Sequence, residues 1–375
     1  MNLRSSETVS TRTKLEFLSR PQTYAGQSKP VQIIETHFAW IFLTERHAYK
    51  MKKPTRQDVM DYRSLAQRAR GCRNELRLNR RLAPTVYLEV VPLGCERDGS
   101  LVLGRGARTV DWIVKMRRLP ATRMLEWSIA NGSVSARDRR ALIAMLAQFY
   151  ARALQRPMSP AEYVQHLRSR ILENLRALQA RGLGIKAIGV TEAVQMQRRY
   201  LDCNVELISS RASRLIEGHG DLRPEHVYLG SRFDAPCVID CLEFDARLRR
   251  LDPAEEVAFL ALECRRLGAE SIARDLVRGI QLAIADPIPE SLTHFYMSHR
   301  ALTRAKVAAW HLRDPHLPRR VRHWRQRANA YIENAMHFAE LALRGGESKL
   351  VFVSGRPKMT PAGLLQRPCV EQSAR

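Results

Sequence analysis

Two neighbouring strings decide the fold: residues 218–227, GHGDLRPEHV, and residues 236–244, PCVIDCLEF. The first places His219 between two glycines and Asp221 directly after them in a tight turn, and the second ends a short apolar strand with Asp240. Phosphoryl transfer to a hydroxyl needs a carboxylate that orients the acceptor and takes its proton, and cations that bind the phosphates. The pattern therefore predicts Asp221 as a general base and Asp240 as a metal ligand, brought together by a short hairpin.

The charge of this region differs from that of the chain as a whole. The 375 residues carry 62 Lys and Arg against 38 Asp and Glu, a net charge of +24 at pH 7. Residues 217–263 instead hold eleven acidic and five basic residues, a local charge of −6. Clustered carboxylates repel one another, and a divalent cation is the usual compensation. Glu243, just after Asp240, is predicted as a further metal ligand.

Each of these residues also has a structural interpretation. His219 can hold the turn by hydrogen bonds to the backbone, Asp221 can cap a turn, and Asp240 can simply end a strand. Their joint occurrence inside the acidic window favours the functional interpretation.

Outward from these strings, the order of elements predicts an α+β chain with two lobes. Strands are expected at residues 31–36, 39–44 and 47–52, a helix at 61–82, and further strands at 87–93, 100–104 and 111–120. Helices are expected at residues 122–130, 137–155, 159–181, 190–213, 253–267, 271–283, 287–312 and 318–344. A small β-rich lobe followed by a mainly helical lobe with an embedded hairpin is the architecture of the protein-kinase-like fold.

These elements divide the chain into four parts. Residues 1–27 are predicted to be a loosely ordered N-terminal extension, 28–119 the nucleotide-binding lobe and 120–345 the catalytic and substrate lobe. Residues 346–375 form a tail with Gly355 and Lys358 in an incomplete phosphate-loop pattern, and we expect it to be inert.

Composition excludes several classes of protein. A hydrophobic fraction of 45% excludes disorder throughout, and no apolar run approaches the roughly 20 residues that cross a bilayer. The N-terminus has no secretory leader, and the 7 cysteines are scattered without a C-x-x-C pair. We therefore predict a reducing, cytoplasmic location and no membrane association. A nucleic-acid-binding protein is the last-ranked hypothesis, because the cations are spread over amphipathic helices without interleaved aromatic residues.

The two strings resemble the H-G-D-x-x-x-x-N and I-D motifs of the aminoglycoside phosphotransferase-like kinases. Four further strings resemble, more narrowly, a group of uncharacterised bacterial phosphotransferase-like proteins that often carry a C-terminal P-loop kinase domain. They are residues 35–54 (ETHFAWIFLTERHAYKMKKP), 72–93 (CRNELRLNRRLAPTVYLEVVPL), 112–120 (WIVKMRRLP) and 300–307 (RALTRAKV). The resemblance covers roughly residues 15–340, and it makes the tail similar to a truncated start of that second domain.

The resemblance implies a nucleotide site in the first lobe. Lys50 matches the lysine that holds nucleotide phosphates, with Lys52 as an alternative because it has the same strand parity, and Glu75 matches the residue that orients this lysine. Met116 and Arg117 fall in the linker against which adenine stacks. The implied ligands are ATP and Mg²⁺, with Mn²⁺ as an alternative metal.

The chain departs from the family pattern at two places. His226 stands five residues after Asp221, where the pattern has Asn, an oxygen ligand that suits Mg²⁺ better than a nitrogen does. Glu243 replaces that ligand, or metal binding is weaker, or the metal differs. Thr36 and His37 occupy the place of the glycine-rich phosphate loop.

The sequence thus predicts an ATP-dependent phosphotransferase that acts on a hydroxyl of a small molecule, with His219 and Asp221 as catalytic residues. The alternative is a catalytically impaired pseudokinase that binds nucleotide and regulates. The oligomeric state is left open.

Overall fold

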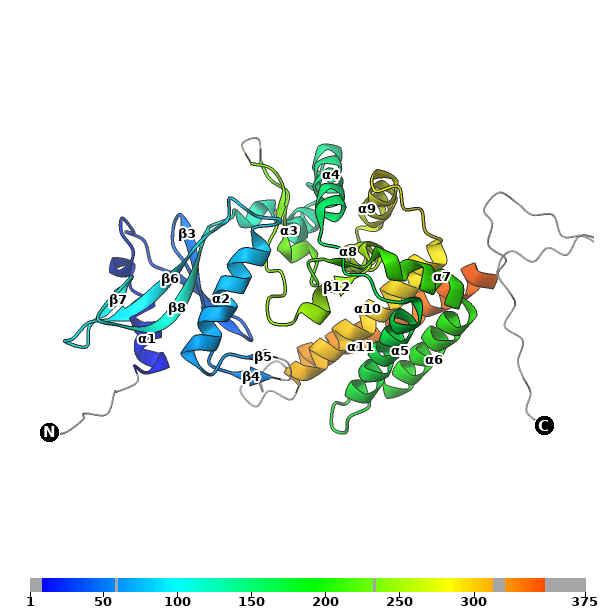
Figure 1. Cartoon of the computed structure of the whole chain (residues 1–375), viewed down its shortest axis with the longest axis horizontal. Coiled ribbons are helices and arrows are strands. Elements are labelled where there is room, and N and C mark those ends of the chain that lie inside the picture. Colours follow the sequence, from blue (N-terminus) through cyan, green and yellow to red (C-terminus); the bar gives the residue numbers. More distant parts are fainter. Residues whose placement is uncertain (1–8, 58–59, 232–233, 313–320, 348–375) are drawn as a thin grey trace, which may run out of the picture. The chain divides into compact units, whose positions relative to one another are not determined.

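The computed structural model describes residues 9–57, 60–231, 234–312 and 321–347 (Figure 1). The chain divides into two compact units. Unit 1 comprises residues 1–145 and 219–249, and unit 2 comprises residues 146–218 and 250–375. The boundaries expected at residues 27, 119 and 345 stay predictions, and the expected phosphate-loop remnant lies outside the described residues. Within the described ranges, no helix combines the length and apolar character needed to span a bilayer.

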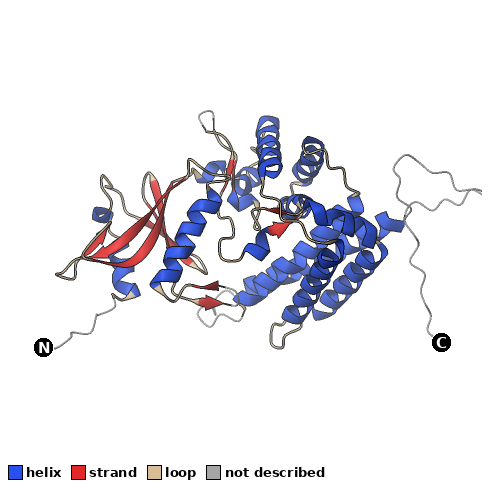
Figure 2. Cartoon of the chain, in the orientation of Figure 1, coloured by secondary structure: helices blue, strands red, loops and turns tan. Residues whose placement is uncertain are grey.

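Unit 1 is built on a six-stranded antiparallel sheet with the strand order β1-β2-β3-β8-β6-β7 (Figure 2). Its strands are β1 (Gln32–Glu35), β2 (Ala39–Leu43), β3 (His47–Lys52), β6 (Tyr87–Cys95), β7 (Leu101–Leu103) and β8 (Arg108–Arg117). The pairing of β3 with β8 brings the two halves of the first lobe together, with Lys50 opposite Val114. The predicted β-rich lobe is confirmed.

The N-terminal segment is more ordered than the sequence analysis predicts. Thr11–Leu18 form helix α1, which Ser10 caps by accepting a hydrogen bond from the backbone N–H of Thr13, and a 3-10 turn follows at Pro21–Thr23. Leu18 is fully buried in the apolar core of the sheet, and Lys14 Nζ lies 2.8 Å from Asp111 Oδ2 on β8. The prediction of a loosely ordered lead-in is therefore wrong for the described part, because two anchoring side chains tie the helix to the sheet.

The helix predicted at residues 61–82 begins later, at Leu65, and ends at Asn79 (α2). Ser64 and Gln67 form a reciprocal capping box at its start, which satisfies two otherwise unpaired N–H groups. Before it, β4 (Arg56–Gln57) and β5 (Met60–Asp61) pair with each other. Helix α2 packs on β6 and β8, so that one of its faces is buried against the sheet.

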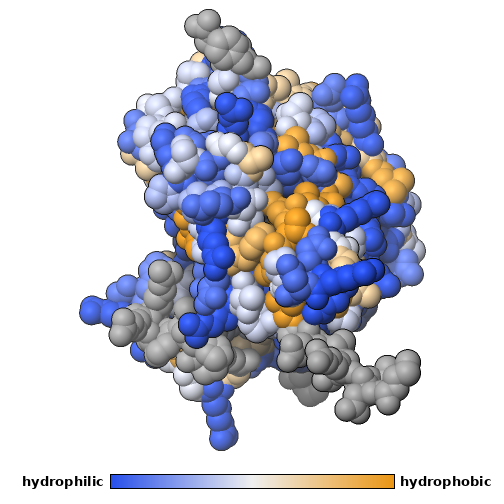
Figure 3. Space-filling view, turned by 90° about the vertical axis from the view of Figure 1, so that its left-hand side faces the viewer, coloured by the Kyte–Doolittle hydropathy of each residue, from blue (hydrophilic) through white to orange (hydrophobic). Residues whose placement is uncertain are grey.

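Residues 219–249 bring the predicted hairpin into unit 1. The hairpin consists of β10 (Val227–Tyr228) and β11 (Cys237–Val238), which pair antiparallel. It follows the 3-10 turn Pro224–His226 and precedes a second one at Ala246–Arg249. Unit 1 also contains the 3-10 turn Ala121–Arg123, helix α3 (Leu125–Ala130) and the first half of α4 (Ala136–Arg152). The edge strand β1 of unit 1 leaves Ile33 and Ile34 exposed. Figure 3 shows hydrophobic surface gathered among hydrophilic residues on the face toward the viewer.

Unit 2 is helical. Its helices are α5 (Pro160–Leu178), α6 (Ala187–Cys203), α7 (Val205–Ser210), α8 (Pro253–Arg266), α9 (Glu270–Ala283), α10 (Glu290–His311) and α11 (Val321–Glu347). A short pair of strands, β9 (Ile216–Glu217) and β12 (Arg250–Leu251), completes it, beside the 3-10 turn Arg211–Arg214. The single helix predicted at 190–213 is wrong at its centre, because Asn204 has a non-helical backbone conformation that separates α6 from α7.

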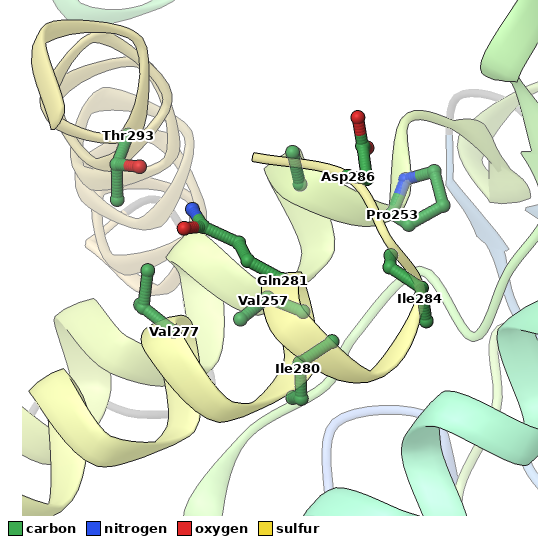
Figure 4. Close-up of a pocket in the computed structure, with 9 residues that line it drawn as sticks. Pro253, Val257, Val277, Ile280, Gln281, Ile284, Asp286 and Thr293 are labelled. Atoms are coloured by element: carbon green, nitrogen blue, oxygen red, sulfur yellow. The ribbon is translucent and has the colours of Figure 1, made fainter. Parts of the chain in front are cut away.

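Asp252 caps the start of α8, since its side chain accepts a hydrogen bond from the backbone N–H of Ala254, ahead of Pro253. The same carboxylate is bound by Arg211 through two contacts of 2.7 Å. A small cavity lies beside this helix start, lined by residues of α8, α9 and α10 (Figure 4). Its volume of about 10 Å³ is room for one water molecule, so it is no substrate site.

Candidate active site

The predicted site residues of unit 1 come from five segments of the chain, of which β8 carries Met116 and Arg117. Lys50 and Lys52 lie on β3, where a spacing of two places both side chains on one face of the sheet. Glu75 lies on α2, in the turn before its C-terminus. His219, Asp221 and His226 belong to the segment that leads into and includes η4 (Pro224–His226), and Asp240 and Glu243 belong to the loop after β11.

Lys50 joins two of these segments. Its Nζ lies 2.6 Å from Asp240 Oδ1 and 2.9 Å from Glu75 Oε1. Burial lowers the pKa of Lys50, but the charges of Asp240 and Glu75 outweigh it and hold the pKa well above its ordinary value. Lys50 is therefore a charged group. Its side chain is 13% exposed, and its partner Asp240 is more accessible, with 44% of the side chain exposed.

Lys52 is more deeply enclosed, with 2% of its side chain exposed. Its Nζ lies 2.6 Å from Glu75 Oε2 and also contacts Glu243 Oε1. Tyr62 donates a hydrogen bond of 2.7 Å to the same Glu243 oxygen, and Lys52 Nζ lies 4.9 Å from the centre of the Tyr62 ring. Glu243 is thus engaged by a buried lysine and a tyrosine.

The two lysines share Glu75, which is fully buried. Burial raises the pKa of Glu243, but the charges of Lys52 and Lys50 outweigh it and lower that pKa. A buried ion pair is costly to break from one side, because the remaining charge loses its partner. This network ties β3 to α2 and to the loop after β11.

The turn that carries Asp221 is held by His219. The His219 Nε2–H donates to the carbonyl of Ile239 at 2.9 Å, and the backbone N–H of Asp221 donates to His219 Nδ1 at 3.3 Å. Burial, together with the nearby His226, lowers the pKa of His219 to about 3, so the ring is neutral at pH 7. Gly220 has φ of +90°, and a Cβ there would lie 3.1 Å from the carbonyl of Leu248. Glycine is therefore required in the turn.

Asp221 has two charged or polar neighbours at its carboxylate. Arg223 Nη2 lies 2.9 Å from Asp221 Oδ2, and His226 Nδ1 lies 3.7 Å from the same oxygen. Arg223 also pairs with Glu225. The carboxylate is 18% exposed, so a bound hydroxyl can reach it.

Asp240 lies beside this turn. Its Oδ2 is 3.6 Å from His226 Nε2, and its backbone N–H donates to the Tyr87 hydroxyl at 3.0 Å. The backbone of Asp240 has φ of +63°, a left-handed conformation that is uncommon for a residue other than glycine. The next residue is fixed by a 2.9 Å hydrogen bond from the N–H of Cys241 to Asn79 Oδ1. Such strain persists only where the surroundings determine it, and it is frequent at functional sites.

Asp240 is ionised. Burial raises its pKa, but the charge of Lys50 outweighs it and holds the pKa below its ordinary value. A divalent cation can be held here by the Asp240 carboxylate with phosphate oxygens of a nucleotide, which is the usual way in which proteins bind Mg²⁺. No group of three or more His, Cys, Asp or Glu residues in the described ranges is arranged around a single metal position. Asp240 thus fits such an ion, whereas the nitrogen of His226 is a poor partner for Mg²⁺.

The two predicted linker residues, Met116 and Arg117, make different kinds of contact. Met116 is buried in an apolar cluster with Ala48 of β3, against which Ile41, Leu43 and Ile239 pack. The backbone N–H of Arg117 donates to the carbonyl of Val86, and its side chain pairs with Asp234 at 3.0 Å.

The structure therefore brings most of the predicted residues together. Lys50, Lys52, Glu75, Asp240 and Glu243 form one ion-pair network, and His226 links it to Asp221 and His219. Sequence reasoning missed Tyr62, Tyr87, Asn79 and Arg223. Only Arg223 carries a signal in the sequence, since it lies two residues after Asp221 inside the deciding string.

Comparison with known proteins yields no matching family model. Uncharacterised proteins of Mycobacterium tuberculosis and Mycobacterium bovis are 30% identical over 281 residues, which is 74% of this chain and 54% of theirs. The chain thus spans about half the length of the curated relatives that it matches.

One solved structure shares the architecture of the chain. A choline/ethanolamine kinase family protein from Mesorhizobium loti is 13% identical, with a TM-score of 0.52 over 89% of this chain and 98% of that one. A glucosamine kinase in complex with glucosamine, ADP and inorganic phosphate is 14% identical, with a TM-score of 0.49 over 88% of this chain and 87% of that one. At sequence identities this low, structural similarity is evidence for a shared fold and not for a shared function. The chain has the protein-kinase-like fold, with a sheet-based first lobe and a helical second lobe.

Proposed function

We propose that the protein is an ATP-dependent phosphotransferase that acts on a hydroxyl of a small molecule. One observation carries the proposal: a sequence of close contacts links Lys50 to Asp240, then to the imidazole of His226, then to Asp221, over 2.6, 3.6 and 3.7 Å. A phosphate-binding cation, a metal-binding carboxylate and a base are the parts that phosphoryl transfer requires.

Asp221 would act as the base. It would take the proton of the substrate hydroxyl while the hydroxyl oxygen bonds to the γ-phosphorus and the bond from that phosphorus to the β,γ-bridging oxygen breaks, releasing ADP. His219 would position Asp221 through the hydrogen bond from the Asp221 N–H. Being fully buried, His219 holds the turn and does not reach the substrate.

Lys50 would bind the phosphates, and Lys52 would hold Glu75 and Glu243. The difference in exposure supports this division, because the Lys50 amine reaches the exposed Asp240 whereas Lys52 is enclosed. Asp240 would hold a divalent cation, which neutralises phosphate charge when bound. The cluster of Ala48 and Met116 would supply an apolar wall for the adenine ring.

Three finer assignments are also proposals. The motif strings support membership of the bacterial phosphotransferase-like group, with residues 346–375 as a degenerate remnant of its P-loop domain. A cytoplasmic location follows from the scattered cysteines, and a small-molecule substrate follows from the fold.

A catalytically impaired pseudokinase is the second candidate. It is favoured by His226 in place of an oxygen ligand and by the 2.9 Å ion pair that joins Arg223 to Asp221. A carboxylate held by a guanidinium is a weaker base, because the positive charge stabilises its ionised form.

Turnover decides between the two. ATP consumption is measured with Mg²⁺ and with Mn²⁺ against a panel of hydroxyl compounds, for the wild type and for Asp221→Asn. We expect the variant to lose about 10²–10⁴-fold in rate while it still binds ATP. Asp98→Asn, in the exposed turn after β6, is the matched control and should keep full activity.

Phosphoryl transfer that survives Asp221→Asn unchanged would remove the role of that residue. Thermal stabilisation by ATP without turnover for any compound would favour the pseudokinase.

A further inference from the structure

We infer that His226 makes the metal site selective for a divalent transition metal that accepts a nitrogen ligand, such as Mn²⁺ or Co²⁺, over Mg²⁺. The inference rests on the proposed function, because nucleotide phosphates would supply the other ligands. It starts from the orientation of the imidazole ring.

The His226 ring is held as a metal-ligating histidine is held. Its Nδ1–H donates to the backbone carbonyl of Asp221 at 2.9 Å. This hydrogen bond fixes the tautomer that leaves the lone pair on Nε2. Histidines that bind metals almost always donate the other ring N–H to a carbonyl or carboxylate in this way.

This nitrogen, Nε2, lies near the exposed carboxylate of Asp240. His226 Nε2 and Asp240 Oδ2 are 3.6 Å apart. Two ligands that share one ion at about 2.1 Å from each atom are separated by about 3.0 Å in octahedral geometry and about 3.4 Å in tetrahedral geometry. A shift of a few tenths of an ångström therefore lets both atoms bind a single cation.

Two cations now occupy these ligand atoms. Arg223 Nη2 donates to His226 Nε2 at 3.1 Å, and Lys50 Nζ lies 2.6 Å from Asp240 Oδ1. Arg223 has Asp221 and Glu225 as other partners, and Lys50 has Glu75. Both cations can withdraw from the metal ligands and remain paired.

Glu243 is tied to other partners, because its Oε1 contacts both Lys52 and Tyr62. Lys52 has 2% of its side chain exposed. Of the three explanations left open by the sequence, the arrangement favours a different metal. Imidazole suits the transition metals, whereas Mg²⁺ demands oxygen and dehydrates reluctantly.

The test uses the full chain with ADP and Mn²⁺. Histidine residues are labelled with ¹⁵N, and electron spin echo modulation of bound Mn²⁺ is recorded, so that protein nitrogen is separated from the ¹⁴N of adenine. We expect ¹⁵N modulation in the wild type and in His323→Asn, a control on the exposed face of α11, and none in His226→Asn.

A competition titration measures selectivity. We expect the Mg²⁺ concentration that displaces half of the Mn²⁺ from the ADP-bound protein to fall at least tenfold in His226→Asn. Absence of ¹⁵N modulation in the wild type would overturn the inference without relying on any variant, and so would an unchanged Mg²⁺ midpoint.

Calorimetric titration of ADP, carried out in EDTA, in Mg²⁺ and in Mn²⁺, separates this inference from the proposed function. Failure to bind ADP under all three conditions would overturn the proposed function. ADP binding with no histidine nitrogen on the metal would overturn only the role of His226.

Discussion

Lys50 Nζ lies 2.6 Å from Asp240 Oδ1, although 190 residues separate the two in the sequence. The same amine lies 2.9 Å from Glu75. Lys52, two residues further along β3, contacts Glu75 from the other side and turns to Glu243. One carboxylate thus serves two lysines, only one of which reaches the exposed Asp240.

Replacing each lysine by methionine should separate binding from stability. Lys50→Met removes a cation next to the exposed Asp240, so we expect a loss of ATP affinity with a modest loss of stability. Lys52→Met removes the positive charge that Glu75 and Glu243 share in a buried site. Loss of one partner of a buried ion pair typically lowers the free energy of unfolding by about 3–5 kcal/mol. Urea unfolding gives the stability of each variant, and calorimetric titration of ATP gives its affinity.

The comparison contains its own control, since the two substitutions are chemically identical and lie on the same face of one strand. If Lys52→Met lost ATP affinity while it kept wild-type stability, and Lys50→Met did the reverse, the two roles would be exchanged.

Much of this arrangement could be predicted because the informative signals are local in the chain. The turn around Asp221 and the strand end at Asp240 are readable as short strings, and their joint placement follows from the hairpin between them. Lys50 and Lys52 could not be told apart, because strand parity gives both the same face. What separates them is the enclosure by Tyr62 and Glu243, which depends on contacts between residues 181 positions apart.

Tyr87 and Asn79 illustrate what a sequence cannot yield. Each binds a backbone N–H of the loop after β11, at Asp240 and Cys241 respectively. A tyrosine on a strand and an asparagine near a helix end have many ordinary explanations. The order of residues 9–27 cannot be predicted for a similar reason, because it depends on Asp111, the distant partner of Lys14.

Gly71 on α2 gives a prediction in which a helix-interior Gly→Ala substitution lowers stability instead of raising it. In a helix interior, Gly→Ala normally stabilises by about 1 kcal/mol. Here a Cβ would lie 2.6 Å from Tyr62 Cε1, closer than side chains allow, and 3.1 Å from Lys52 Cε, which is a tight contact. We expect Gly71→Ala to destabilise the protein by about 1–3 kcal/mol in urea unfolding, as overpacking of a core does.

The Tyr62→Ala background serves as the control for Gly71. Removing the ring removes the closest contact, so Gly71→Ala should cost much less there than in the wild type. An equal loss in both backgrounds would show that Tyr62 is not the reason why α2 has a glycine at this position.

His299 on α10 gives a prediction for the pH dependence of stability. The ring is fully buried, and its Nδ1 lies 3.6 Å from Glu255 Oε1. Arg170 and Arg300 reach the same oxygen, at 3.1 and 2.8 Å. Burial first, and then the charge of Arg170, lower the pKa of His299 to about 4, despite the opposing effect of Glu255.

The sign of the effect follows from where the proton binds first. An unfolded histidine titrates near pH 6.5, so between about pH 6.5 and pH 4 the unfolded chain holds a proton that folded His299 does not. His299 therefore contributes stability above pH 6.5 that is lost as the pH falls toward 4, at up to about 1.4 kcal/mol per pH unit. Replacement by glutamine, which does not titrate, should make the free energy of unfolding less dependent on pH in this window. Urea unfolding of the wild type and of His299→Gln at pH 7, 6 and 5 measures the difference, and parallel curves would show that the folded protein protonates His299 as readily as the unfolded chain does.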